Sequence, residues 1–292
     1  MAALVDRKHL LSSAEMAHFV AHGSVILENV VPAELNERAI GVFDAGIQGY
    51  PYGTPLDVAF PPGSFVRELL DLPVVAGAVQ SLVGPGPRID HHAVHIRPPH
   101  GGDAQNMHGD AILDTRTDAF DMQLMYYPRA VTLEQGGTLS VPGSHFRKIN
   151  QTGIGRYQNL AGQTRLVCPA GTVVLLHHGI WHGGRRNDSD HPRYMFKIRF
   201  NPAVRQLRLW NTDDIDDPAV GRELTTSFGW TSANEGRLEL VNRAKLWRVL
   251  TGDQLFDIDY YLTREQLRPQ FVAPDATDVR LGSSDRPAGW NF

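Results

Sequence analysis

The chain has 292 residues, of which 42% are hydrophobic and 21% are charged, and its formal net charge is −4. This composition is ordinary for a globular protein, and the mildly acidic balance disfavours nucleic-acid binding, which usually requires a strongly basic face. No run of about 18 apolar residues predicts a membrane span, and the N-terminus lacks the apolar core of a secretory signal. Cys168 is the only cysteine, which rules out an intramolecular disulfide and favours the cytoplasm.

The first third of the chain has the spacing of helices separated by turns. Ser and Pro residues favour helix starts, and Gly residues favour helix ends. Residues 48–64 are rich in Gly and Pro and predict a loop. The other predicted elements, in chain order, are a helix from Ser12 or Ser13 to Gly23, a strand at 25–27, a helix from Pro32 to about Ile47, and a helix over 72–83.

From residue 89 to residue 202 the pattern changes to short β-rich segments separated by turn residues. Several short strands of this kind predict an all-β sandwich or barrel, against which the N-terminal helices pack. We expect one domain over 1–292, with helices in 1–88, the β-core at about 89–202 and a C-terminal extension at 203–292. The predicted strands are 92–97, 122–127, 138–141, 172–177 and 194–200. In the extension, an acidic loop at 213–218 precedes a helix to about residue 250, and little regular structure is expected after 272.

The sequence His108-Gly109-Asp110 places two metal-ligand side chains two residues apart. In an extended strand, residues i and i+2 project to the same side, so both can face one ion. Downstream, an apolar strand ends among three further candidates, His177, His178 and His182, and spacing alone does not choose between them. Two imidazoles and one carboxylate match the ligands of a non-haem Fe(II) oxygenase. The same set also describes a catalytic zinc site.

Arg193 favours the oxygenase interpretation over a zinc hydrolase. Residues 187–192 predict a turn, and the strand that follows would carry Arg193 back beside the histidine-bearing strand. Arginine offers a planar pair of donors that suits a carboxylate. A 2-oxoglutarate-dependent oxygenase needs such a partner for the distal carboxylate of its co-substrate, whereas a zinc hydrolase does not.

Two longer motifs resemble those of a known family. The stretch 136–145, with its Pro142-Gly143-Ser144-His145 turn, and the segment 178–182 followed by Asn187, Ser189 and Arg193 are similar to motifs of the phytanoyl-CoA dioxygenase (PhyH)-like Fe(II)/2-oxoglutarate oxygenases. The likeness covers roughly residues 10–202. It implies a double-stranded β-helix, or jelly roll. It also implies that His182 is the distal iron ligand, with His178 beside it but not on the metal.

The resemblance also implies the roles of the other site residues. His108, Asp110 and His182 would hold Fe(II), and Arg193 would bind 2-oxoglutarate. Asn106 and Thr138 match assisting residues of the family, and Gln123 and Tyr127 are candidates for lining the same pocket. The implied activity is hydroxylation of an unactivated C–H bond of a small metabolite with O2, which releases succinate and CO2. Desaturation, epoxidation or ring formation would use the same ligands. A non-catalytic ligand-binding barrel and a zinc hydrolase are the alternatives.

Overall fold

Two antiparallel sheets form the centre of the computed structural model, which describes residues 5–110, 116, 118–147, 159–228 and 233–253. The larger sheet has the order β1-β7-β4-β9-β3-β2, and the smaller has the order β6-β5-β8. The strands are β1 (Ser24–Leu27), β2 (Thr54–Pro55), β3 (Arg88–Arg97), β4 (Met122–Tyr127), β5 (Thr138–Val141), β6 (Thr164–Arg165), β7 (Thr172–His177), β8 (Trp181–Gly184) and β9 (Arg193–Asn201). This is the predicted jelly roll.

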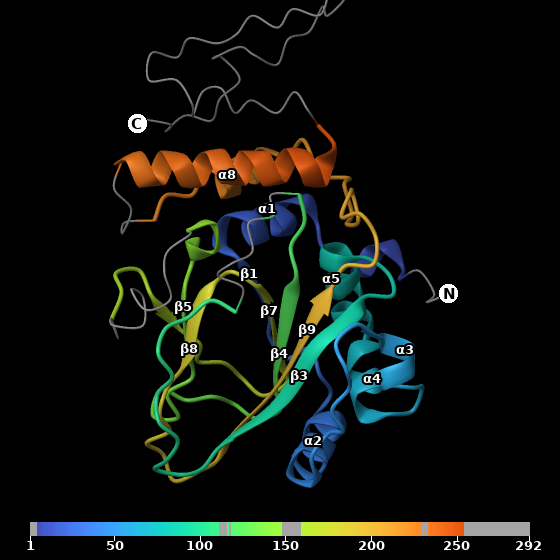
Figure 1. Ribbon diagram of the computed structural model, residues 1–292, viewed down its shortest axis with the longest axis vertical. Helices are drawn as coiled ribbons and strands as arrows, with labels where there is room; N and C mark the ends of the chain where they lie inside the picture. The colour runs from blue at the N-terminus through green and yellow to red at the C-terminus, as the bar shows by residue number, and fades with distance from the viewer. Residues whose placement is uncertain (1–4, 111–115, 117, 148–158, 229–232, 254–292) are drawn as a thin grey trace, which may run out of the picture.

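The strands β4 and β7 of the larger sheet are buried on both faces. Alternate residues of β4 point to opposite faces of the sheet. Leu124 and Tyr126 belong to the large hydrophobic cluster that includes the helices, and Met125 and Tyr127 belong to a smaller cluster on the other face. Helices α2 (Ala33–Ala45), α3 (Leu56–Ala59), α4 (Phe65–Leu70) and α5 (Pro73–Val83) cover the outer face (Figure 1). In this layer the ring of Phe43 lies 6.2 Å from that of Tyr126.

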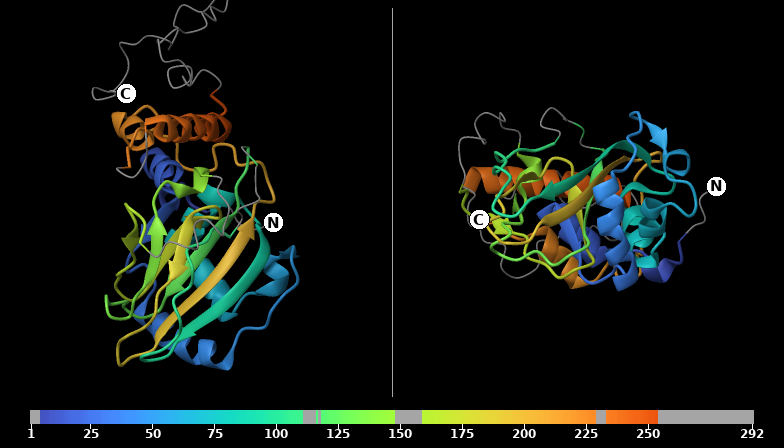
Figure 2. Two further views of the ribbon diagram at one scale, coloured as in Figure 1. Left: turned by 60° about the vertical axis from the view of Figure 1, so that its left-hand side comes forward. Right: turned by 90° about the horizontal axis from the view of Figure 1, so that it is seen from below.

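A second group of helices covers one end of the sheets. It consists of α1 (Ser13–His22), α7 (Pro218–Leu224) and α8 (Ala233–Thr251). Helix α8 lies beyond α1 in both side views (Figures 1 and 2). Trp210 and Trp247 pack here with a ring separation of 5.7 Å, and both belong to the main hydrophobic cluster. The C-terminal extension therefore shares the core of the N-terminal helices, as far as it is described.

The start and end of α1 agree with the sequence prediction. Ser12 is the N-cap, with a reciprocal capping box to Glu15, and Gly23 ends the helix at φ 82°. The acidic loop adds a second cap, because the carboxylate of Asp214 accepts hydrogen bonds from the backbone N–H groups of Ser13 and Ala14 at 2.7 and 3.1 Å. A carboxylate at this position also complements the positive end of the helix dipole.

Several elements differ from their predictions. The predicted loop 48–64 contains β2 and α3, and the short helices α4 and α7 were not predicted. Helix α2 begins after Pro32, which is its N-cap, and ends at Ala45. Short helices stabilised by tertiary contacts have too few turns to show a clear period. The predicted irregular tail after residue 272 lies outside the described residues.

The helices of the described ranges contain no candidate membrane span, since none combines sufficient length with sufficient apolar character. The described residues also form two 3-10 helices of three residues each, η1 (Arg7–His9) and η2 (Ser144–Phe146).

Candidate metal and co-substrate site

His108 and His182 are 74 positions apart but lie directly opposite each other. The backbone N–H of His182 donates to the carbonyl of His108 at 2.7 Å, and the N–H of His108 donates to the carbonyl of His182 at 2.9 Å. This closed pair of hydrogen bonds fixes the register of the two residues. Their rings lie 4.6 Å apart on the same side. The fold therefore brings together the first and last members of the predicted triad.

Hydrogen bonds to the backbone orient both imidazole rings. Nδ1 of His108 lies 2.8 Å from the carbonyl oxygen of Asn106, and Nδ1 of His182 lies 3.0 Å from that of Ile180. A carbonyl oxygen only accepts, so each Nδ1 carries the proton and each Nε2 presents a lone pair. Burial lowers the pKa of His182 and so favours this neutral form. Outer hydrogen bonds of this kind hold metal-binding histidines in place.

Asp110 completes a cluster of three ligand atoms that all lie within 4.8 Å of one another. Its Oδ1 is 3.6 Å from Nε2 of His108 and 3.9 Å from Nε2 of His182. Its buried Oδ2 has no hydrogen-bond partner in the described structure, and Nζ of Lys197 lies 4.0 Å away. Burial acts to raise the pKa of Asp110, but His182, Lys197 and His108 outweigh it and the net shift is downward. The group is therefore an ionised carboxylate.

Arg193 is buried at the start of β9 and lines the same pocket as His108 and His182. Its Nη1 donates to the carbonyl oxygens of Gln135 and Gly137, and its Nη2 donates to that of Arg185 at 3.0 Å. These neutral acceptors hold the guanidinium without cancelling its charge. Within the described ranges no carboxylate pairs with Arg193 and no group accepts from its Nε. Burial lowers the pKa of this group, as expected for a cation that lacks a counter-ion.

The four predicted assisting residues occupy different positions. Thr138 and Tyr127 line the pocket, and their hydroxyl oxygens are 3.0 Å apart. Gln123 lies on the same face of β4, two positions before the pocket residue Met125, and its buried Oε1 has no partner in the described part of the chain. Asn106 has an exposed side chain that does not line the pocket, and its contribution there is the carbonyl that orients His108.

The pocket has four further polar lining residues that the sequence analysis did not assign to it: His95, Arg97, Gln105 and Lys197. Lys197 could have been found by alternation, because it is four residues after Arg193 on one strand and so shares its face. His95 lies in the pocket because β3 pairs with β9, with His95 opposite Met195 and Arg97 opposite Arg193. Burial, together with Lys197 and Arg97, lowers the pKa of His95 to about 4, so its ring is neutral.

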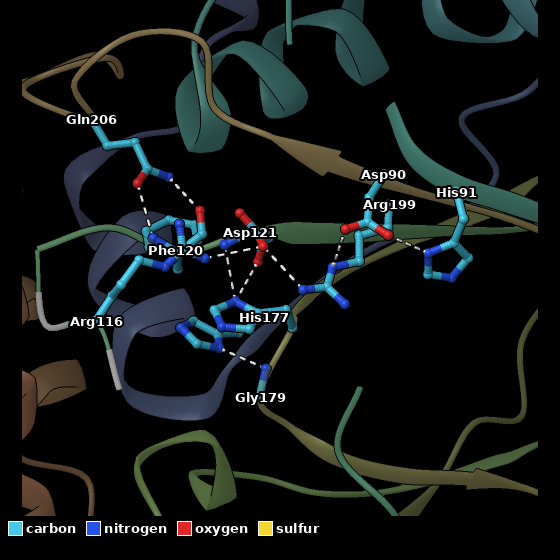
Figure 3. A network of polar contacts seen from close by, with 10 residues as sticks. Asp90, His91, Arg116, Phe120, Asp121, His177, Gly179, Arg199 and Gln206 are labelled. Atoms are coloured by element: carbon cyan, nitrogen blue, oxygen red, sulfur yellow. Dashed lines mark hydrogen bonds and ion pairs between the residues drawn. The ribbon is translucent and has the colours of Figure 1, made fainter. Parts of the chain in front are cut away.

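His178 belongs to a different polar cluster, which is centred on Asp121. Figure 3 shows Asp121 with its partners Arg199 and Arg116. Nδ1 of His178 lies 2.9 Å from both the backbone nitrogen and the carbonyl oxygen of Asp121. The Asp121 carboxylate accepts from Arg199 at 3.0 Å and pairs with Arg116 at 3.0 Å. This places His178 away from the metal cluster, as the family resemblance implied. His177 packs against the rings of His145 and Phe120.

Asn187 organises the connection between β8 and β9. Its buried amide nitrogen donates to the carbonyls of Arg97, Pro98 and His191, and its amide oxygen accepts from the backbone and hydroxyl of Ser189. The predicted turn is therefore tied to the end of β3 as well as to itself. Because β9 begins two residues after His191, this turn positions Arg193.

Replacing Asn187 with alanine is expected to lower the free energy of unfolding by about 2–4 kcal/mol, because several buried polar groups lose their partner. Urea unfolding followed by circular dichroism measures this change. Asp188→Ala is the matched control: its side chain is exposed and pairs with Arg186 at the surface, so a change within about 0.5 kcal/mol is expected. Equal stabilities of the two variants would contradict a structural role for the Asn187 amide.

Comparison with known proteins supports the family suggested by the motifs. Residues 56–195 match the family model described as phytanoyl-CoA dioxygenase (PhyH). This range contains His108, Asp110, His182 and Arg193, and the match confirms the resemblance seen in the sequence. No curated protein sequence matches the chain significantly.

Solved structures share the fold at low sequence identity. HygX from Streptomyces hygroscopicus, with nickel, 2-oxoglutarate and hygromycin B bound, aligns with a TM-score of 0.53 and 18% identity over 70% of this chain and 92% of HygX. The non-haem α-ketoglutarate-dependent carbocyclase SnoK from nogalamycin biosynthesis gives 0.54 and 17% over 80% and 97%. The corresponding epimerase SnoN gives 0.52 and 18% over 66% and 84%. These similarities confirm the jelly-roll fold.

Proposed function

From the phytanoyl-CoA dioxygenase-like character of residues 56–195, we propose that this protein is an Fe(II)- and 2-oxoglutarate-dependent dioxygenase. The observation that carries the proposal is that three convergent metal-ligand atoms, from Asp110 and from the pocket residues His108 and His182, lie beside a pocket whose buried Arg193 pairs with no carboxylate of the described residues. We propose one catalytic domain over residues 1–292. Its support is a single hydrophobic cluster that runs from Leu11 to Leu250.

The residues of the cluster fit a divalent metal ion. Both histidines present Nε2, and the Asp110 carboxylate is ionised, with no hydrogen bond from the described residues to its buried oxygen. Donors bound at about 2.1 Å and at right angles to one another lie about 3 Å apart. The separations of 3.6 and 3.9 Å therefore require a contraction of less than about 1 Å. His108, Asp110 and His182 would cover one face of the ion and leave the other for small ligands.

Arg193 is the residue that would bind the distal carboxylate of 2-oxoglutarate. A dicarboxylate entering the pocket supplies the negative charge that no described residue brings to the guanidinium, and Nε, from which no described group accepts, can donate to it. The Thr138 hydroxyl, held by Tyr127, offers a further donor at the same wall. Arginine fits this role better than a point charge because its donors are fixed in a plane.

When bound, iron and 2-oxoglutarate supply the activation of O2, and the protein supplies position and exclusion of water. The backbone bridge and the two carbonyl acceptors fix the imidazoles before any metal arrives. Met125 and Met195 form apolar parts of the pocket wall. Lys197 adds positive charge near Asp110, which keeps the carboxylate ionised.

We propose hydroxylation of an unactivated C–H bond of a small metabolite as the reaction, with release of succinate and CO2. Retention of Asp110 supports this over halogenation, in which the family resemblance implies that the carboxylate is lost. The hygromycin B bound to HygX supports a small-molecule substrate. Since the similar folds also include an epimerase and a carbocyclase, the product must be identified by mass spectrometry.

The direct test is anaerobic titration of the metal-free protein with Fe(II) and then with 2-oxoglutarate. A visible absorption band that needs both components is expected, followed by substrate-stimulated succinate release in air from a metabolite screen. A band that forms without any substrate-dependent turnover would favour the non-catalytic binding protein. Absence of the band, together with hydrolysis that depends on Zn2+, would favour the hydrolase.

A further inference from the structure

A second group of potential metal ligands lies outside the pocket, between α1 and α7. It consists of His18, His22 and Glu223, each of which offers one ligand atom within 4.8 Å of the other two. His18 and His22 are four residues apart on α1, so they lie on the same face of the helix. Glu223 comes from α7, which packs closely on α1. We call these three residues the α1–α7 cluster.

The separations in the α1–α7 cluster bracket those of a tetrahedral metal site. Oε2 of Glu223 is 2.9 Å from Nδ1 of His18 and 3.7 Å from Nε2 of His22. Ligand atoms bound at 2.0–2.1 Å in tetrahedral geometry lie about 3.3 Å apart. An ion between the three side chains therefore needs shifts of only a few tenths of an ångström on the two contacts to Glu223. The two imidazole rings are stacked, with centroids 3.9 Å apart and planes 11° apart, so one ring has to rotate before the lone pairs of both point at a single ion.

The hydrogen bonds of the described residues do not account for the position of the His22 ring. Its ring contacts are the stack with His18 and an edge contact with Phe228, and no hydrogen bond to its ring nitrogens occurs in the described ranges. Burial, with a contribution from His18, lowers the pKa of His22 to about 4. Nε2 of His22 lies 3.7 Å from Oε2 of Glu223 and makes no hydrogen bond within the described ranges, so this nitrogen is open to an ion.

The surroundings of the cluster are compatible with a cation. Arg243 lies over the Phe228 ring and repels positive charge, but Glu239 lies 3.9 Å from its guanidinium and offsets part of that effect. The side chains of His18, His22 and Glu223 are 42%, 22% and 34% exposed, so an ion can reach them from solvent. The remaining coordination position would be open to water.

We propose that His18, His22 and Glu223 form a second metal site that binds a divalent transition-metal ion of the Zn2+ type. Two imidazoles and one carboxylate suit such an ion better than they suit Mg2+ or Ca2+, which prefer oxygen ligands. The site is independent of the iron site, since it shares no residue with it.

Binding at this site would connect α1 to the C-terminal extension. The carbonyl of His22 accepts from the backbone N–H of Gly143, and the His145 ring lies 3.0 Å from the carbonyl of Val20. The end of α1 is therefore tied to the turn that follows β5. A metal that joins α1 to α7 stabilises the folded chain by mass action, because the unfolded chain does not present the three ligands together.

Equilibrium dialysis of the untagged full-length protein against Zn2+ tests the proposal. Two equivalents of Zn2+ per chain are expected for the wild type and one for Glu223→Gln. Glutamine has nearly the same shape as glutamate, and the side chain at this position is partly exposed. One equivalent is also expected for Asp110→Ala, and none for the double variant. His91→Ala is the matched control: it removes a histidine that pairs with Asp90 at 2.6 Å but belongs to no three-ligand group in the described residues, and two equivalents are expected.

Two further measurements distinguish loss of metal binding from loss of folding. Zn2+ should raise the thermal midpoint of Asp110→Ala, and the added Glu223→Gln substitution should remove that rise while leaving the metal-free midpoint within a few degrees. Co2+ bound to Asp110→Ala should give visible d–d bands that Glu223→Gln removes. A single equivalent in the wild type that Asp110→Ala removes, or an unchanged second equivalent in Glu223→Gln, would overturn the proposal. A single equivalent that Glu223→Gln removes would instead count against the iron site and leave this proposal standing.

Discussion

Replacing Asp110 with alanine is expected to abolish substrate-coupled succinate formation and to weaken Fe(II) binding at the pocket by more than about 100-fold. Loss of an outer hydrogen-bond partner of a metal ligand already costs 10–100-fold, and here the ligand itself is removed. The carboxylate is also the only negative ligand among the three donors, so the ion would face two neutral imidazoles with Lys197 nearby. Anaerobic Fe(II) titration and a succinate assay measure the two effects.

The metal-free fold should survive this substitution. The Asp110 carboxylate makes contacts of 3.6–4.0 Å with His108, His182 and Lys197, all longer than ordinary hydrogen bonds. Asp190→Ala is the matched control: it also removes a carboxylate beside a histidine, but at an exposed position paired with His100. Wild-type turnover in Asp110→Ala, or an equal loss in Asp190→Ala, would refute the assignment of the triad.

The second large effect is expected for Arg193→Ala, which should raise the 2-oxoglutarate concentration needed for half-maximal activity by about 30-fold to several thousand-fold. Loss of a charged, hydrogen-bonded partner of a desolvated carboxylate costs roughly 2–5 kcal/mol. The guanidinium is held in place by carbonyls and is not neutralised by any described carboxylate, so its charge is available to the co-substrate. Steady-state kinetics at saturating substrate measure the change.

Two companion variants separate charge from geometry. Arg193→Lys keeps the positive charge but loses the planar donors, so an intermediate requirement for 2-oxoglutarate is expected. Arg186→Ala is the control, since Arg186 is half-exposed and pairs with Asp188 at the surface. Because Arg193 also holds the carbonyls of Gln135 and Arg185, thermal midpoints must accompany the kinetics. An unchanged requirement for 2-oxoglutarate in a folded Arg193→Ala protein would disprove its role.

Elements with strong local signals could be predicted from the sequence. The strand 122–127 and the strand 172–177 match the structure residue for residue, because both are continuous apolar or aromatic runs bounded by turns. Gly23 ends α1 as expected, since the chain needs a left-handed residue there. By contrast, β8 was not predicted as a strand: its sequence Trp-His-Gly-Gly has little β character of its own, and pairing with β5 determines its conformation.

The functional site likewise contains residues that the sequence predicts and residues that only the fold brings there. His108 and Asp110 follow from their spacing, but the choice of His182 over His177 and His178 depended on the family resemblance. In the structure His178 binds Asp121, which is a contact between residues 57 positions apart and invisible to any local pattern. Lys197 and His95 enter the pocket through the pairing of β3 with β9. Of the two, only Lys197 has a local signal, which is its place four residues after Arg193 on the same strand.

The backbone bridge between His108 and His182 has one more consequence. A shift of either segment by one residue would turn its histidine side chain to the opposite surface. The pair of hydrogen bonds therefore fixes the alignment of two distant parts of the chain. Amide protons of these two residues should therefore exchange slowly with deuterated solvent in the metal-free protein. Folding alone would then set the positions of the two histidine ligands, and binding of the ion would need little rearrangement.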